Sequence, residues 1–568
     1  MSDREPGATS FVILVWLASA ASLLVLAWFY TVETPLWDDW ANVAVLTGER
    51  PLTMGWLWSL HNEHRIALPR LIYISLAWLT GASFRAQALL NAILLIVATG
   101  SLIRAARNLR GWTSYADAFL PLIFCGVSHQ RNVLFAFQIQ LILSTVLLAF
   151  AVHVVSRRPS GLGTPSAGLM AVMLLLLPLC GANGLGFVPA IALAMIYQAV
   201  LDWRQSRLRA VLLVAGAVLG GILIVLYFRN YHSLEHTDEP ASLMERFRIA
   251  MQLLATGWGD SAFRTWPWSG WLEGLVIAGG VAALLVNWIR GPERRMRTTW
   301  LIALFGAVGS LAIGIGWGRG GWTDRAGFET RYVTLAAPAL AIAYLAWCEA
   351  GSIAMRFAQM TMFALACIAV WPNTEGVLKA VAEHKDRFDA LARDIAAGLP
   401  PSRLIPRHQG FLHNSHDDLY LGMPMMKKAR LGLYARMADD PPFREISLSK
   451  GPTSMTGMTG QEGHFRSTMV DPYLNYTLPA PLPVAGVRLR FRHSNPQGLP
   501  ARFLMLWSND ANPGRTPPGR HSIWKLATRE DKTIIVWTDA TIDHLRIQPD
   551  NKRCEFDVED LTLLIANP

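Results

Sequence analysis

The sequence is short of charge and of cysteine. Only 16% of its 568 residues are charged and 52% are hydrophobic, so the chain is too apolar for a soluble protein. Its length is too great for one domain. The five cysteines have no metal-knuckle spacing, and the polar tail holds only Cys554, so it cannot form an internal disulfide. Nothing resembles a cleavable signal peptide, because the first apolar run is full length and lacks a small-residue cleavage site. The composition predicts an integral membrane protein.

The net charge of +10 does not indicate nucleic-acid binding, because most arginines stand at the ends of apolar runs, where they report topology and contact with anionic lipid. On a rule of roughly 20 residues per span, about eleven transmembrane helices are expected, with a cytoplasmic amino terminus and an extracytoplasmic carboxyl terminus. The predicted spans are 11–30, 87–103, 116–127, 139–155, 169–180, 187–201, 211–228, 271–289, 300–317, 332–347 and 360–371.

The first outer loop, 31–86, carries the most informative pattern. Two carboxylates, Asp38 and Asp39, stand between Trp37 and Trp40 just after the first span. A second polar group, His61-Asn62-Glu63-His64-Arg65, precedes a short apolar stretch, 65–81, which is expected to be an interfacial helix. The pattern favours a reaction centre at the membrane surface; an ordinary solvated loop with interfacial tryptophans is the alternative.

Charged residues also occur on the face where the positive-inside rule does not expect them. The loop 319–332 combines glycines, which let backbone approach a ligand closely, with Arg319, Arg325 and Arg331, whose guanidiniums suit bidentate phosphate contacts. A lipid phosphate at the membrane surface would fit this loop. Structural salt bridges between loops are the alternative.

Three other polar groups have two readings each. Gln138 and Gln140 open a span, where their amides need partners that sugar hydroxyls or neighbouring helices could supply. His232 and His236 have the spacing of helical metal ligands, but Asp238-Glu239-Pro240 argues against a helix, so a solvated loop is favoured. The basic, amphipathic stretch 420–437 is expected either to lie on the membrane or over an active-site mouth, or to pack between domains.

The composition changes at Pro372, where the apolar runs end, and this predicts three domains. Residues 1–372 form the transmembrane domain, 373–444 a helical extracytoplasmic connector, and 445–568 a domain of short alternating strands. Short strands separated by Gly- and Pro-rich turns are typical of a β-sandwich.

The order of these features resembles the GT-C class of membrane glycosyltransferases, which use polyprenyl-phosphate sugars as donors. The resemblance rests on the acidic pair Asp38-Asp39 after the first span, the interfacial helix before the second, and the closing soluble domain. Lipid A aminoarabinose transferases, protein O-mannosyltransferases and cell-wall arabinofuranosyltransferases share that plan. The segments 62–65, 137–140 and 331–332 are similar to an uncharacterised bacterial group, and the tail resembles the carbohydrate-binding β-sandwiches of such enzymes.

The resemblance implies that an acceptor hydroxyl attacks the anomeric carbon while polyprenyl phosphate leaves, with inversion. Asp38, or else Asp39, would take the proton; neighbours in an extended segment point in opposite directions, so only one is expected to face the sugar. Arginines would hold the phosphate charge. The implied substrate-binding residues are Glu63, His64, Arg65, Gln138, Gln140, Arg319, Arg325, Arg331 and Tyr332.

The implied partners are a polyprenyl-phosphate sugar, an extracytoplasmic glycan or protein acceptor and the bilayer of a bacterial inner membrane. Arabinofuranosyl is one candidate sugar, and the sugar, acceptor, lipid length and oligomeric state stay open. No cofactor is assigned, and metal dependence stays open because one spare carboxylate can hold a divalent cation. The rival interpretations are a carrier or flippase for a lipid-linked sugar, which would place ionisable residues mid-span and often show paired repeats, and a glycan-binding scaffold of the envelope.

Overall fold

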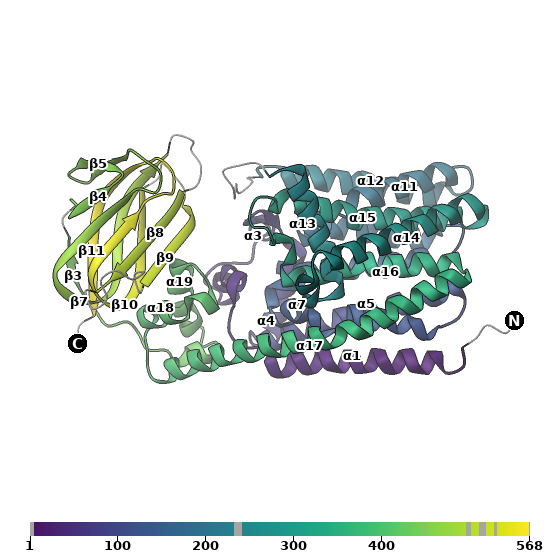
Figure 1. Cartoon of the computed structure of the whole chain (residues 1–568), viewed down its shortest axis with the longest axis horizontal. Coiled ribbons are helices and arrows are strands. Elements are labelled where there is room, and N and C mark those ends of the chain that lie inside the picture. The colour runs from purple at the N-terminus through teal and green to yellow at the C-terminus, as the bar shows by residue number, and fades with distance from the viewer. Residues whose placement is uncertain are drawn as a thin grey trace. The chain divides into compact units, whose positions relative to one another are not determined.

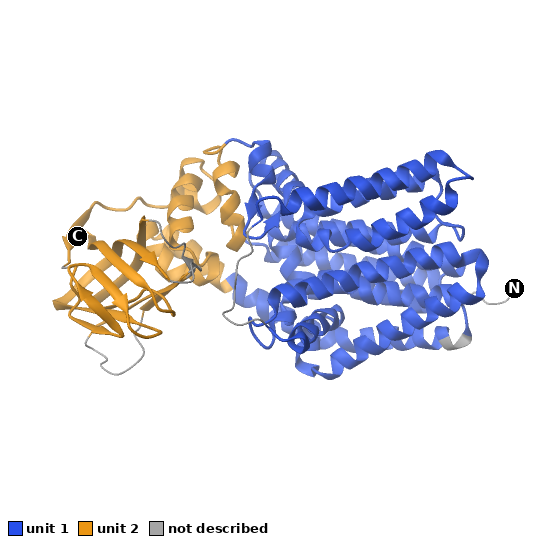
Figure 2. Cartoon of the chain, turned by 90° about the horizontal axis from the view of Figure 1, so that it is seen from above, with its two compact units in different colours: residues 1–33, 51–385 blue, residues 34–50, 386–568 orange. Residues whose placement is uncertain are grey.

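The computed structural model describes residues 5–231, 241–448, 450–495, 501–509, 519–526 and 531–566. Two compact units share the chain (Figure 2). The first comprises Met1–Glu33 and Pro51–Lys385, and the second comprises Thr34–Arg50 and Asp386–Pro568. The first outer loop is therefore divided: its residues 34–50 pack with the carboxyl-terminal part of the chain, whereas residues 51 onwards pack with the apolar helices. The predicted histidine group at 232–238 lies outside the described residues.

The first unit is a bundle of apolar helices (Figure 1). With adjoining 3-10 turns counted, nine of the described helices are long and apolar enough to cross a membrane, which confirms a helical membrane protein. They are α1 (Ala8–Tyr30), α5 (Phe84–Arg110), α8 (Ile139–Ser156), α11 (Val188–Asp202), α12 (Arg207–Phe228), α14 (Trp268–Arg290), α15 (Arg295–Arg319), α16 (Val333–Ala350) and α17 (Ile353–Ala396).

Two of the eleven predicted spans are shorter than this. The segment 116–127 contains α6 (Phe119–Phe124), whose six residues rise about 9 Å, and the segment 169–180 lies in α9 (Thr164–Leu176) and the following 3-10 turn. A run of apolar residues does not distinguish a complete span from a short buried helix. The total of about eleven crossings therefore stays a prediction.

The arginine-rich ends of the helices lie together at one end of the bundle, the end of the amino terminus (Figure 1). Three of these arginines are paired with carboxylates: Arg110 with Asp117 at 2.9 Å, Arg209 with Asp202 at 2.7 Å, and Arg297 with Glu349 at 2.7 Å. We call this the arginine-rich end. It is the end that the positive-inside rule assigns to the cytoplasm.

Shorter elements form the opposite end of the bundle, which we call the loop end (Figure 1). They are α3 (Met54–Trp58), the small strands β1 (Leu60–His61) and β2 (His64–Arg65), and α4 (Ala67–Leu79), which is the helix expected at 65–81. Gln87 on α5 donates to the Tyr73 carbonyl at 2.8 Å and so joins α4 to the long helix that follows it.

The helix α17 continues through the predicted boundary at Pro372 and runs for 44 residues, from the last apolar segment into the polar part of the chain. Proline removes one backbone hydrogen bond within a helix but did not end this one. In the second unit, α18 (Pro401–Leu412) and α19 (His416–Lys428) follow. Leu404, Leu419 and Met423 are among their buried side chains. The helix α19 packs against α18, η1 (Trp37–Asn42) and α2 (Val43–Leu46).

The chain ends in an antiparallel domain that confirms the predicted β-sandwich. Its strands are β3 (Phe443–Ser447), β4 (Ser454–Thr456), β5 (Met458–Gln461), β6 (His464–Ser467), β7 (Tyr473–Ser494), β8 (Ala501–Ser508), β9 (Gly519–Leu526), β10 (Asp531–Gln548) and β11 (Glu555–Ala566).

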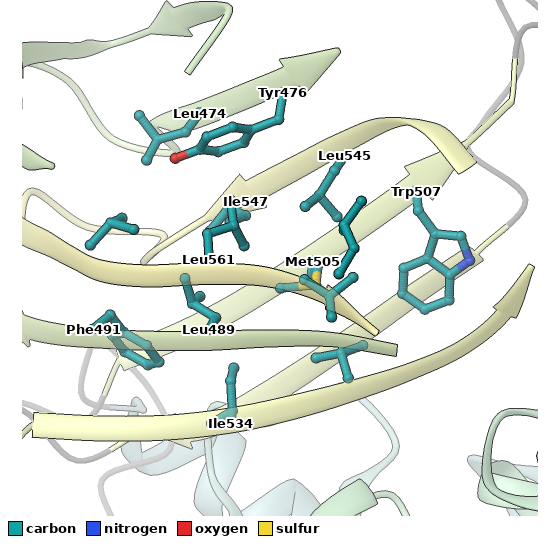
Figure 3. Packing of buried hydrophobic residues seen from close by; sticks show 14 of the residues in the cluster. Leu474, Tyr476, Leu489, Phe491, Met505, Trp507, Ile534, Leu545, Ile547 and Leu561 are labelled. Carbon is teal, nitrogen blue, oxygen red and sulfur yellow. The ribbon is translucent and has the colours of Figure 1, made fainter. Parts of the chain in front are cut away.

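Two long strands, β7 and β10, belong to both layers of the sandwich. The second half of β7 pairs with β11 and with the first half of β10. The first half of β7 pairs with β4 and with the second half of β10, and the end of β10 also pairs with β8. Register shifts after Trp537 and Ile542 mark the change. Between the layers, Phe491 and Leu489 pack with Leu545, Ile547 and other apolar side chains (Figure 3).

Candidate active site

The polar group 61–65 forms a hairpin at the loop end of the membrane unit. His61 pairs with His64 and Leu60 with Arg65 across a turn made by Asn62 and Glu63. Asn62 has a φ of 50°, which lies in the left-handed region that asparagine tolerates better than most residues. The His61 ring lies 4.7 Å from the Phe137 ring, so the hairpin contacts the turn that carries Gln138.

Arg65 fixes this hairpin to the end of α12. Its side chain is buried and donates to three backbone carbonyls: Nε to Tyr227 at 2.9 Å, Nη1 to Trp58 at 2.6 Å and Nη2 to Arg229 at 2.6 Å. A guanidinium has five N–H groups, so most of its donor capacity is used within the protein. The sequence suggested a phosphate ligand here; the structure gives Arg65 the geometry of a clamp between two elements.

His64 lies among charged side chains from distant parts of the sequence. Burial lowers its pKa to about 4, Glu63 opposes that shift, and the charges of Arg319 and Arg331 lower the pKa further. His64 is therefore neutral near pH 7. Its Nδ1 is buried and has no hydrogen-bond partner among the described residues. Glu63 also acts on Tyr231, whose phenol pKa is raised mainly by burial and then by this carboxylate.

The charges of two of the three predicted loop arginines, Arg319 and Arg331, thus lower the pKa of His64. Arg319 ends α15 and its guanidinium stacks 3.7 Å above the Trp322 ring. Arg331 precedes α16, and its side chain is about a third exposed. Its Nε lies 3.9 Å from a Glu329 carboxylate oxygen. Arg325 lies 5.2 Å from the Phe263 ring and is exposed.

The backbone around Arg331 is held by buried amides and hydroxyls. Asn132 donates to the Arg331 carbonyl at 2.7 Å and to the Thr334 hydroxyl at 2.5 Å. His129 bonds the same hydroxyl through Nδ1 at 2.8 Å, and Tyr332 is buried beside these groups. The backbone of Arg331 is therefore held by the 129–132 segment.

The two predicted glutamines are buried at the start of α8. The side-chain oxygens of Gln138 and Gln140 have no hydrogen-bond partner among the described residues. The Gln140 backbone carbonyl accepts from Asn183 at 2.9 Å, which ties α8 to α10 (Ala182–Leu185). Buried amide oxygens without partners are costly, and a ligand with hydroxyl groups would satisfy them.

The acidic pair belongs to the second unit, where Thr34, Trp40 and Glu49 fasten the segment 34–50. Thr34 shares a 2.7 Å hydrogen bond with the Tyr434 hydroxyl, the Trp40 ring meets the Tyr434 ring edge-on, and Glu49 pairs with Lys428 at 2.6 Å. These contacts come from residues far along the chain, and no sequence pattern indicated them.

Asp38 and Asp39 differ in their surroundings. Asp39 is buried, with 1% of its surface exposed, and its Oδ2 accepts from the Leu36 N–H at 3.1 Å, so it caps the turn that it belongs to. Asp38 is only partly buried. Trp37, just before the pair, has a φ of 49°, a conformation that is strained for a bulky residue and that occurs mostly at turns and functional sites.

The structure thus brings Glu63, His64, Arg319 and Arg331 together in the membrane unit, with Gln138 on the neighbouring turn. It places Asp38 and Asp39 in the other unit, and their relation to those arginines stays a prediction. Among the described residues, no group of three His, Cys, Asp or Glu side chains is arranged to hold a metal ion.

One buried acid escaped the sequence reasoning. Glu273 on α14 is 0% exposed and accepts from the Trp258 indole at 2.9 Å. Nearby in the chain, Asp260 has its pKa raised to about 7 by burial. A carboxylate within an apolar run is itself the signal that would have revealed Glu273.

The fold and site define a multi-pass membrane protein with a carboxyl-terminal β-sandwich. No protein-family model and no curated protein matches the chain. Among solved structures, the chain is similar to the crystal structure of ArnT from Cupriavidus metallidurans bound to undecaprenyl phosphate. The sequences are 12% identical, the match covers 75% of this chain and 89% of that chain, and the TM-score is 0.39.

Proposed function

We propose that the protein is a GT-C glycosyltransferase that moves a sugar from a polyprenyl-phosphate donor to a hydroxyl of an extracytoplasmic glycan or protein. The observation that carries the proposal is the group of charges around His64 at the loop end, where Arg319 and Arg331 act on one neutral histidine. Two guanidiniums near the end of membrane-crossing helices are suited to the phosphate of a lipid whose tail lies in the bilayer.

In this proposal Arg319 and Arg331 hold the phosphate of the donor. As the bond between the anomeric carbon and the phosphate oxygen breaks, the leaving phosphate gains a negative charge and needs that charge stabilised. Because His64 is neutral, Arg319 and Arg331 are the cations of this group. The neutral His64 ring can also donate and accept hydrogen bonds. Tyr332 and Arg325 are assigned to the margin of the same site.

Asp38 is the proposed general base. It would accept the proton of the acceptor hydroxyl while that oxygen bonds to the anomeric carbon, and the configuration there would invert. Asp38 is preferred to Asp39 because Asp39 already caps its own turn. The strained backbone of Trp37 supports a functional role for the residue that follows it.

The sugar hydroxyls are assigned to Gln138 and Gln140, whose side-chain oxygens have no protein partner among the described residues. Glu63 is proposed to orient the acceptor or the arginines. Arabinofuranosyl is the first sugar to test. The β-sandwich is proposed to bind carbohydrate. The membrane is proposed to be a bacterial inner membrane with the β-sandwich on its outer side.

The test is glycan transfer in cells at matched protein levels, read by mass spectrometry of envelope glycans and glycoproteins. Asp38→Asn and Arg331→Ala are each expected to lower transfer by at least about a hundredfold, the scale of a lost base or of a lost charge contact. Arg264→Ala is the matched control because that side chain is exposed and belongs to no part of the proposed site, and it should retain most activity. Unchanged glycans in both Asp38→Asn and Arg331→Ala cells would reject the transferase and favour a carrier or a scaffold.

A further inference from the structure

A cleft at the arginine-rich end of the bundle is separate from the site just described. It measures about 350 Å³ and is lined by Arg104, Asn108, His153 and Arg157. Arg104 and Asn108 belong to the last turns of α5, and His153 and Arg157 stand at the end of α8. All four lining residues are polar.

The two arginines of this cleft differ from others at the same end. Arg110, Arg209 and Arg297 each have a carboxylate partner. Among the described residues, no carboxylate lies within ion-pair distance of Arg104 or Arg157. Both guanidiniums act electrostatically on His153, so the cleft gathers positive charge that an anion would offset.

The other two lining residues are fixed in place. The Asn108 amide donates to the Ser156 hydroxyl at 3.0 Å, and that hydroxyl donates to the His153 carbonyl at 2.7 Å. The His153 Nδ1 is buried without a partner among the described residues. The Asn108–Ser156 hydrogen bond thus joins the ends of α5 and α8 beside the two arginines.

The cleft lies near the ends of two apolar helices, where lipid headgroups are expected. Arg104 precedes the end of α5 at Arg110 by six positions, or about 9 Å. The polar zone of one leaflet is about 5–8 Å thick, and long arginine side chains extend toward it from inside the helix.

We propose that this cleft binds the phosphodiester of an anionic phospholipid. Arg104 and Arg157 would contact the phosphate oxygens through charge-assisted hydrogen bonds, with the Asn108 side chain beside them. Basic pockets between helices on the cytoplasmic side are suited to such headgroups. The site is independent of the glycosyltransferase proposal, since none of its residues belongs to the loop end.

The test is native mass spectrometry of the full-length protein in detergent, with phosphatidylglycerol and phosphatidylcholine added in turn. The wild type is expected to retain phosphatidylglycerol in preference to phosphatidylcholine. The double variant Arg104→Ala/Arg157→Ala should lose at least about tenfold in this preference, the effect of two charge-assisted contacts. The control Arg107→Ala/Arg204→Ala removes the same charge from exposed positions that do not line the cleft, and it should bind like the wild type.

Equal loss in both double variants would overturn the proposal, because it would show attraction by diffuse charge alone. Absence of any preference in the wild type would also overturn it. A third arm adds inorganic phosphate to the lipid-bound wild type. If phosphate displaces the lipid at micromolar concentration, the ligand is a soluble phosphate and the lipid assignment is wrong; persistence of the lipid supports it.

Discussion

His64 shows how neighbours set the chemistry of a single side chain. Its pKa falls from 6.5 to about 4 through burial first, then through the two arginines, against the influence of Glu63. Hence between those two values the unfolded chain binds a proton that the folded protein does not, and stability falls as the pH falls through this window.

His64→Gln is therefore expected to reduce the loss of thermal stability on acidification. The measurement is the unfolding temperature of the purified protein at about pH 7.5 and about pH 4.5, a range that spans most of the titration. The value at the higher pH is the internal control, because there His64 is neutral in both states and only the structural effect of the substitution remains. An identical acid-induced drop in wild type and variant would show that His64 does not titrate in this way.

At the scale of elements, the hairpin β1–β2 depends on one clamp. Three carbonyls from two segments converge on Arg65, and the side chain is 7% exposed. Removing it leaves those acceptors without their donor in a buried site, at a cost of about 1 kcal/mol or more each.

Arg65→Ala is expected to destabilise the protein by about 2–4 kcal/mol and to lower transfer as well, because the hairpin that carries Glu63 and His64 loses its attachment to α12. The measurement is thermal or denaturant unfolding in detergent beside the transfer readout. Arg229→Ala is the matched control: the Arg229 backbone carbonyl accepts from Arg65, but its own side chain is exposed. A wild-type stability in Arg65→Ala would contradict the clamp.

Arg65 also shows where sequence reasoning stops. The apolar runs, the helix within 65–81 and the alternating strands were predictable because burial leaves a period in the sequence. The partners of Arg65 are backbone carbonyls, which every residue has, so no residue pattern distinguishes a clamp from a phosphate ligand. Arg319 and Arg331 were predicted as phosphate ligands by the same reasoning, and in the structure their charges act on His64.

The helix α17 gives a second example. The composition changes at Pro372, but the helix does not end there, because composition reports the surroundings of a segment and not its backbone. In the same way, apolar content did not reveal that the helices at 116–127 and 164–180 are shorter than 18 residues, and whether they cross the membrane stays a prediction.

At the scale of the whole molecule, the acidic pair depends on the far end of the chain. Thr34 and Tyr434, 400 positions apart, share a hydrogen bond, and segment 34–50 belongs to the same compact unit as α18 and α19. The sequence placed Asp38 and Asp39 in a loop of the membrane domain; the structure assigns their segment to the second unit, where Asp39 is buried and Asp38 is partly buried.

Gly422 on α19 tests that dependence. A Cβ atom at this position would lie 2.7 Å from the Trp40 ring, and Trp40 is 5% exposed and follows Asp39 directly. Gly422→Leu is therefore expected to displace Trp40, to cost about 1–3 kcal/mol of stability, and to lower transfer by at least about tenfold through the shift of the turn that carries the proposed base, Asp38.

Gly410→Leu is the matched control, because Gly410 lies on the neighbouring helix α18 and a Cβ there meets no atom within 4 Å. Both variants add the same side chain to a helical glycine, so a general effect of leucine on helix or surface would appear in both. Loss of transfer in Gly422→Leu alone would show that the carboxyl-terminal half of the chain sets the geometry of the acidic pair. Full activity in that variant would mean that the packing of Trp40 on α19 does not position Asp38.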